Sequence, residues 1–521
     1  MSSPTRVKAL IIGIDGGSFD LIDPLISAGQ LPVLAGLLRR GISAKTTCTW
    51  PAHTAPGWSS FVTACHPGGH GIYQFFDTQD RDYGAVIRQS GDLGRSNAWD
   101  WLARSGYSLG LINIPMSHPP RDLPGYQITW PLEQTLRYCR PASLLTELTK
   151  ADAHFQPDLA TMFRGDLGYL EEAEAGVVAR TRSVTTLMRQ RPADLVMAVF
   201  TEVDRVCHHY WHFCDDAHPR HEAAPPGSGW QAAITRIYQA VDAAIGELLA
   251  LVDDDTTVVV VSDHGLGVGR HELAINTVLE AAGLLATRPG PDGRSEPAGQ
   301  ASWFRGASDD AAGTREVDFS RTAVYSPVPG SFGLNVNLAG RQRDGIVTDR
   351  DGLLAEATSV VSAITLPDGP GSGPAFRAVV PREVAYPGPH VGSAPDLLLI
   401  PNDEGIVVGA GIGGDAWRPS WQTGLHRYAG LWLQASPRCK PARLSEPVSI
   451  VDVIPTLLAD LGVGWPAGVH GEPVLDAFDA GSVPAGAEQY LEQDQPAPDH
   501  EPASRAEDEY TARMLREMGY I

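Results

Sequence analysis

Side chains that bind divalent metal ions recur in four separated segments of the sequence. Three aspartates and three histidines form the mixed oxygen and nitrogen set that borderline metals such as zinc prefer. Six such ligands, split three and three, would hold two metal ions about 4 Å apart. The six are Asp15 in IGIDGG, Asp204 and His208 in FTEVDRVCHHYWH, Asp263 and His264 in VVSDHGLG, and His426 in TGLHRYAG.

Each segment alone has an ordinary structural explanation, so the prediction rests on their conjunction and order. Asp204 and His208 are four residues apart and would share one face of a helix, as many solvated pairs do. The DHG segment is more specific, because Gly265 permits a sharp bend that brings both preceding side chains into one cavity. The neighbouring His209 and His212 fit the spacing less well, and we expect them to support or pack against the site.

The elements that must position these residues are apolar runs that end in carboxylates. VKALIIGID (7–15), ADLVMAVFTEVD (193–204) and TTVVVVSDHG (256–265) each predict a buried strand with function at its carboxyl end. Residues 230–252 predict an amphipathic helix between the last two runs. A strand, helix and strand with acids at the strand ends indicates a parallel sheet whose site lies along its carboxyl edge.

The rest of the chain extends this α/β pattern into a catalytic domain over residues 5–478. We expect a central, mostly parallel sheet flanked by helices, with cap or insertion regions within 77–190 and 286–390. An acidic, Pro- and Ala-rich tail with a short terminal helix follows over 479–521. Helices are also predicted around 21–39 and at 449–462, and strands at 394–401 and 428–435.

Composition narrows the class of protein. The 521 residues are 43% hydrophobic and 20% charged, as in a packed globular enzyme. A net charge of -22 without a Lys/Arg cluster argues against binding of nucleic-acid polymers, although bound divalent cations can reverse the sign locally. The six cysteines contain no CxxC pair, and the first apolar run is too short for a membrane span. We therefore expect a cytoplasmic protein without a membrane anchor; the oligomeric state is not predicted.

The order of these motifs resembles the alkaline phosphatase superfamily, specifically its type I phosphodiesterase/nucleotide pyrophosphatase branch. The chain is most similar to the bacterial group described as predicted phosphohydrolases or phosphomutases. The resemblance covers nearly the whole chain outside residues 286–315 and the acidic tail. It rests on IIGIDGGSFDLIDPL, TWPAHTAPGWSSFVTACHPGGHGI, INIPMSHPP, FTEVDRVCHHYW, VVSDHGLG, TGLHRYAG and SIVDVIPTLLADLG.

The resemblance implies two divalent metal ions, expected to be Zn²⁺ with Mn²⁺ as the alternative, and a threonine nucleophile. Thr54 in AHTAPGW occupies the nucleophile position, at a helix start where Ala55 and its neighbours would offer backbone N–H groups to a phosphoryl oxygen. Thr54 would equally serve as the helix N-cap. One metal ion would be held by Asp15, Thr54, Asp263 and His264, and the other by Asp204, His208 and His426.

The reaction implied is hydrolysis of a phosphate ester, diester or monoester, through a phosphothreonine intermediate. Arg270, His271 and Asn276 follow the DHG segment and are candidates for contacting a small phosphorylated substrate. Phe75 stands where the nucleotide-hydrolysing branch has an asparagine, which argues against direct transfer of nucleotide specificity. The alternatives are a phosphomutase, a phosphonate hydrolase, or a non-catalytic protein that binds a phosphorylated metabolite. The segment that begins at Cys48, CTWP, lacks the C-x-P-x-R order of sulfatases, which argues against a sulfatase.

Overall fold

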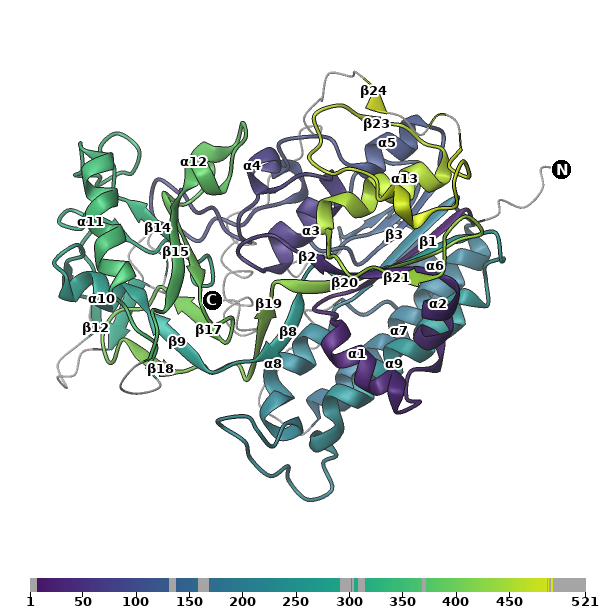
Figure 1. The fold of residues 1–521 in the computed structure, drawn as a ribbon, viewed down its shortest axis with the longest axis horizontal. Helices are drawn as coiled ribbons and strands as arrows, with labels where there is room; N and C mark the ends of the chain where they lie inside the picture. The colour runs from purple at the N-terminus through teal and green to yellow at the C-terminus, as the bar shows by residue number, and fades with distance from the viewer. Residues whose placement is uncertain are drawn as a thin grey trace.

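The computed structural model describes residues 7–130, 137–157, 168–290, 301, 304–307, 314–367, 372–484, 486 and 489–490. The chain forms a large lobe around a central sheet and a smaller second lobe, joined by the β8–β19 ribbon (Figure 1). The second lobe is built from residues between β8 (Gly265–Val268) and β19 (Gly424–Arg427). The predicted acidic tail and terminal helix fall mainly on 491–521, outside the described residues.

The central sheet has ten strands and is parallel through its middle. β7, β1, β6, β3 and β4 pair in parallel, whereas β20 and β2 add antiparallel pairs on one side and β5 adds one on the other. The predicted fold class, a mostly parallel sheet flanked by helices, is confirmed. In spatial order the strands are β21 (Ala442–Arg443), β2 (Ile42–Thr47), β20 (Ala429–Ala435), β7 (Thr257–Val261), β1 (Ala9–Ile14), β6 (Leu195–Phe200), β3 (Leu109–Ile112), β4 (Gly125–Ile128) and β5 (Cys139–Arg140), with β22 (Val448–Ser449) beside β2.

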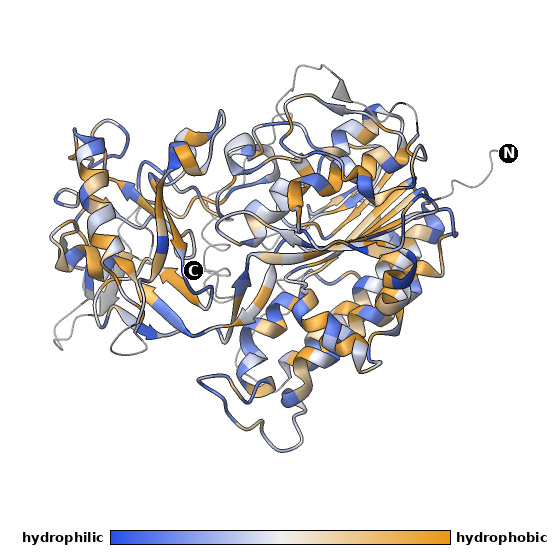
Figure 2. Cartoon of the chain, in the orientation of Figure 1, coloured by the Kyte–Doolittle hydropathy of each residue, from blue (hydrophilic) through white to orange (hydrophobic). Residues whose placement is uncertain are grey.

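Strand β1 shows why the sheet needs helices on both faces. Its residues are all buried and alternate between two hydrophobic cores, Leu10 and Ile12 in one and Ala9 and Ile11 in the other. The apolar colour of the sheet and the two-sided helices are visible in Figures 1 and 2. The first core is covered by α1 (Phe19–Ser27), α2 (Pro32–Arg40), α6 (Leu144–Lys150), α7 (Tyr169–Gln190), α8 (Glu202–Cys214) and α9 (Ala233–Leu249), and the second by α3 (Thr54–Thr63), α5 (Ala98–Arg104) and α13 (Val453–Leu461).

The second lobe has its own core, which residues 72–93 of the large lobe also enter. A four-stranded sheet and two three-stranded sheets form this lobe, with helices on the outside (Figure 1). Its elements are β9 (His271–Ala274), α10 (Ile275–Ala281), β10 (Thr287–Pro289), β11 (Arg305–Ala307), β12 (Thr314–Val317), β13 (Val324–Tyr325), β14 (Gly333–Val336), α11 (Arg350–Ser362), β15 (Phe376–Pro381), α12 (Arg382–Ala385), β16 (Leu397–Pro401), β17 (Ile406–Gly409) and β18 (Trp417–Pro419).

Several segments differ in the structure from the elements predicted from the sequence. The helix expected around 21–39 is two helices, separated where Pro32 begins α2. The strand at 394–401 belongs to the second lobe, whereas within 77–190 the elements α5, β3, β4, β5, α6 and α7 belong to the central sheet and its helices. In the described part of the chain no single helix has the length and hydropathy of a membrane span. Only α1 and α2 taken together, bent by 104°, reach that composition.

Candidate metal centre and nucleophile

The carboxyl ends of three adjacent strands bring the predicted acids together. β1 lies between β7 and β6, with Gly13 level with Val261 on one side and Val199 on the other. Asp15 directly follows β1, and its N–H donates to Phe200 O. Asp263 follows β7 by two residues, and Asp204 lies in the first turn of α8 just after β6. Parallel pairing therefore places all three carboxylates at one edge of the sheet.

The first group of ligand atoms surrounds the His264 ring. Its Nε2 atom lies 3.5 Å from Asp15 Oδ1, 3.3 Å from Asp263 Oδ2 and 3.3 Å from Thr54 Oγ1. Thr54 and both acids are almost fully buried. The nucleophile predicted from the sequence thus contacts one of the predicted metal ligands directly, across 210 residues of chain.

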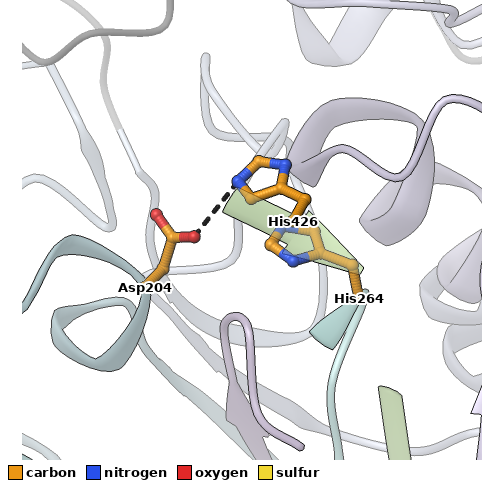
Figure 3. A group of neighbouring side chains, drawn as sticks. All are labelled: Asp204, His264 and His426. Carbon is orange, nitrogen blue, oxygen red and sulfur yellow. Dashed lines mark ion pairs between the residues drawn. The ribbon is translucent and has the colours of Figure 1, made fainter. Parts of the chain in front are cut away.

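The second group meets at Asp204 Oδ1. His208 Nε2 lies 3.1 Å from this oxygen, and His426 Nε2 lies 3.2 Å from it. His426 arrives by the antiparallel pairing of β19 with β8, which sets it opposite Leu266, two residues after His264. The His264 and His426 rings are stacked, with their centroids 3.8 Å apart. Figure 3 shows the two rings together with Asp204. One ribbon therefore joins the two groups.

The histidine rings are oriented for metal binding by their second nitrogens. Nδ1 of His208 lies 2.7 Å from Gly424 O, and Nδ1 of His426 lies 2.9 Å from Ala52 O. His264 Nδ1 lies 3.1 Å from its neighbour's carbonyl, Gly265 O. A carbonyl accepts only from N–H, so each neutral ring carries its proton on Nδ1 and directs the lone pair of Nε2 to the centre. That is the tautomer that metal-bound histidines adopt.

The carboxylates repel one another in this buried space. Burial, followed by the charges of Asp263 and Asp204, raises the pKa of Asp15 well above its usual value. Burial and Asp204 raise the pKa of Asp263 in the same way. Burial opposes ionisation of Asp204 too, but the charges and hydrogen bonds of His208 and His426 in their protonated forms outweigh it and hold its pKa well below the usual range. Because three buried carboxylates lie close together, bound cations would be needed to neutralise their negative charge.

The donor set fits divalent metals. Asp15 Oδ1 and Asp263 Oδ2 are buried oxygens without a hydrogen-bond partner among the described residues. Two triads have ligand atoms within 4.8 Å of one another, and His264 belongs to both of them, so the two groups adjoin. The triads are Asp15, Asp263 and His264, and Asp204, His264 and His426.

Thr54 is the first residue of α3, and the helix cap is the residue before it. His53 is extended and its Nδ1 accepts the Ala55 N–H at 3.2 Å, so the capping role considered for Thr54 belongs to His53. The Ala55 amide is therefore engaged by His53, and Pro56 has no N–H to offer. The first turn of α3 leaves the Thr54 amide as its remaining donor, because Gly57 N–H donates to His53 O.

Besides Ala55, three residues after the DHG segment are predicted to contact substrate, and they lie on the second-lobe side of the ribbon. Arg270 pairs with Asp403 at 2.5 Å. His271 is half-buried at the start of β9. Asn276 is fully buried, and its amide donates to Ala410 O and accepts from Ser326 N, which is the pattern of a structural side chain. Contact of these residues with substrate stays a prediction.

The other histidines considered from the sequence have structural surroundings. His209 packs against Tyr169 and Trp421, and burial lowers its pKa to about 3. His212 Nδ1 lies 3.1 Å from Thr423 Oγ1, and His70 bonds Ser60 Oγ at 2.8 Å within the HGI turn. The structure leaves all three outside the two groups of ligand atoms.

Sequence reasoning missed two residues that organise the centre. Trp58, fully buried on α3, donates its indole N–H to Asp15 Oδ2 at 3.2 Å. Arg427 donates to the carbonyls of Val268, Glu404 and His426 and so ties the ribbon to a turn of the second lobe. Trp58 follows Gly57 in APGW and Arg427 follows His426 in TGLHRYAG, and these neighbours were the available sequence signals.

The chain is similar to known proteins in both family and fold. The family described as type I phosphodiesterase/nucleotide pyrophosphatase matches residues 9–429. The fold is similar to that of phosphonoacetate hydrolase from Sinorhizobium meliloti 1021 in complex with phosphonoacetate. That match has a TM-score of 0.51 and 16% identity, and covers 87% of this chain and 94% of that chain. Wild-type alkaline phosphatase PafA matches with a TM-score of 0.57 and 12% identity, over 92% of this chain and 100% of that one.

Proposed function

Because this chain belongs to the type I phosphodiesterase/nucleotide pyrophosphatase family, and is thus a phosphoric ester hydrolase, we propose that it works through a phosphothreonine intermediate at Thr54. The family match confirms the resemblance inferred from the sequence motifs. The observation that carries the proposal is the 3.3 Å contact between Thr54 Oγ1 and His264 Nε2, inside a cluster of buried carboxylates. A hydroxyl held there serves no evident packing purpose, whereas it suits a nucleophile beside cations.

Two divalent ions would be held by Asp15, Asp263, His264 and Thr54 on one side and by Asp204, His208 and His426 on the other. Such ions lower the pKa of a hydroxyl and balance the charge on phosphoryl oxygens. Zn²⁺ suits three carboxylates and three imidazoles, with Mn²⁺ as the alternative.

The chain's own groups perform two displacements. Thr54 Oγ attacks phosphorus as the ester oxygen leaves, and the Thr54 proton ends on the departing alcohol. Water then attacks the phosphothreonine, which restores the Thr54 hydroxyl and releases the phosphate product. The Thr54 N–H at the start of α3 is placed to donate to a phosphoryl oxygen in both steps.

The substrate we propose is a small phosphorylated molecule. Phe75, in the position where an amide was expected from nucleotide-hydrolysing relatives, is fully buried and packs its ring against His53 and Trp130. This apolar packing favours a substrate other than the usual nucleotides. A cytoplasmic location stays a prediction from the six cysteines, all of which are free thiols.

The test compares bis-p-nitrophenyl phosphate with p-nitrophenyl phosphate before and after metal chelation. We expect turnover that falls to background with chelator and returns with Zn²⁺ or Mn²⁺, and a higher kcat/KM for one of the two esters identifies a diesterase or a monoesterase. Turnover that survives chelation, or that is unchanged in Thr54→Ala, would refute the mechanism.

A further inference from the structure

Helix α3 presents three residues to the centre at helical spacing. Thr54, Gly57 and Trp58 stand at positions i, i+3 and i+4 and therefore share one face. Thr54 supplies the hydroxyl beside His264. Gly57 and Trp58 carry no group that could react with a substrate, but each lies against a predicted metal ligand.

Gly57 allows the helix to approach Asp263. A Cβ atom at Gly57 would fall 2.9 Å from Asp263 Cβ and 3.0 Å from its carbonyl oxygen, closer than real Cβ contacts. Gly13 makes a matching space in β1, because a Cβ atom there would fall 2.6 Å from the Trp58 ring. Gly57 therefore lets α3 lie close to Asp263, and Gly13 leaves room for the indole ring of Trp58 on the same helix.

Trp58 uses that space to reach Asp15. Its Nε1–H donates to Asp15 Oδ2 at 3.2 Å, with both side chains almost fully buried. The second oxygen, Asp15 Oδ1, has no hydrogen-bond partner in the described residues and lies 3.5 Å from His264 Nε2. The indole therefore distinguishes the two oxygens: one is engaged by the helix, and the other faces the ligand cluster.

We propose that Trp58 is a positioning residue that makes Asp15 a one-oxygen metal ligand and fixes it relative to Thr54 on the same helix. The inference rests on the proposed function and extends it to a residue that contacts no substrate. A buried hydrogen bond to a carboxylate is among the stronger kinds, and partners of this type hold metal ligands in orientation. The nucleophile and its first ligand are then held by one rigid element.

The competing explanation is that Trp58 only fills the core, and Trp101 offers a matched comparison. Trp101 is also fully buried, and its indole N–H donates to Ser96 Oγ at 2.8 Å, away from the ligand cluster. Phenylalanine at either position removes one hydrogen bond and a similar volume from the same hydrophobic core. Only the Trp58 change removes a partner of a metal ligand.

The experiment measures metal binding by wild-type, Trp58→Phe and Trp101→Phe proteins. Metal-free samples are titrated with Zn²⁺, and separately with Mn²⁺, against a chromophoric chelator, and the Tm of each protein is recorded. We expect Trp58→Phe to weaken one of the two bound equivalents about 10- to 100-fold and to leave the other unchanged. Trp101→Phe should lower the Tm similarly and bind both equivalents as the wild type does. Trp58→Leu, which likewise has no donor for Asp15, serves if Trp58→Phe does not fold.

Wild-type metal binding in the Trp58 variants would overturn the proposal, and so would an equal loss of affinity in Trp101→Phe. The titration does not depend on turnover. If the wild type binds two metal ions but hydrolyses no phosphate ester, the proposed function fails while the role of Trp58 is still decided by the same curves.

Discussion

His208 Nε2 lies 3.0 Å from His426 Nε2, although 218 residues separate the two histidines. Each ring directs its Nδ1 atom at a backbone carbonyl, so two lone pairs face each other across that short distance. Lone pairs at this separation repel unless a proton or a metal ion lies between them. Asp204 Oδ1, within 3.2 Å of both nitrogens, adds a negative charge that favours the cation.

Replacing His208 should therefore remove metal-dependent activity, whereas replacing its neighbour His212 should not. His208→Asn is expected to lower kcat/KM at least about 100-fold and to reduce the bound metal by one equivalent, because a ligand of one ion is lost. The control is His212→Asn. His212 lies on the same helix as His208, and its Nδ1 hydrogen-bonds with Thr423 Oγ1. Metal analysis and ester hydrolysis measure both variants. Equal losses in the two would contradict the assignment of His208.

Thr54 should carry phosphate during turnover. Acid quenching with a ³²P-labelled ester is expected to trap a labelled protein in the wild type and none in Thr54→Ala, whose kcat should fall at least about 1000-fold. Thr63→Ala tests the same helix away from the centre, since Thr63 Oγ1 only donates to Ser59 O. Label that persists in Thr54→Ala would show that another residue is the nucleophile.

Gly57 should tolerate no side chain, because α3 lies directly against Asp263. Gly57→Ala places a Cβ atom within 3.0 Å of Asp263, so the helix must move away and carry Thr54 with it. We expect kcat to fall at least about 10-fold, since small misplacements of reacting groups are costly. Gly36 in α2 is the matched control: its Cβ atom would meet nothing closer than 3.7 Å. Gly36→Ala should increase the free energy of unfolding by about 0.5–1 kcal/mol, because alanine has the higher helix propensity. Its Tm should therefore rise slightly, and kcat should not change.

Asp396 should make the second lobe sensitive to acid. Burial alone would raise its pKa, but hydrogen bonds from Arg341, Arg350 and the Val336 N–H hold it below the ordinary 3.8. A depressed carboxyl pKa stabilises the fold above the unfolded-state value, and this stability is lost as the pH falls through the folded-state value. Asp396→Asn should cost about 3 kcal/mol at pH 7.

The measurement is denaturant unfolding of wild type and Asp396→Asn from pH 7 down to pH 3. The difference in free energy of unfolding between wild type and Asp396→Asn should become smaller toward pH 3, because protonation of Asp396 removes the charge that the arginines bind. A gap that stays constant with pH would mean that the carboxylate's shape, and not its charge, stabilises the lobe.

The apolar runs ending in Asp15 and Asp263 determined the centre of the fold from the sequence alone. A buried parallel strand must be apolar throughout, so an acid at its end stands out and marks the functional edge. The spacing of Asp204 and His208 was equally informative, since helical periodicity fixes which side chains share a face. These features depend on local geometry, which neighbouring residues in the chain specify.

Only the tertiary structure decided how distant segments meet. His426 reaches the centre through the β8–β19 ribbon, and Trp58 reaches Asp15 through space left by Gly13. His53 replaces Thr54 as the helix cap because its ring folds back onto the Ala55 N–H. The positions of His426 and Trp58 depend on pairing or packing between residues far apart in sequence, for which periodicity carries no information. The His53 cap is local, but it depends on the orientation of the ring, which the residue type alone does not specify. The chain's own pattern therefore predicts the metal ligands, and the packing of α3 and of the ribbon decides how these side chains are oriented.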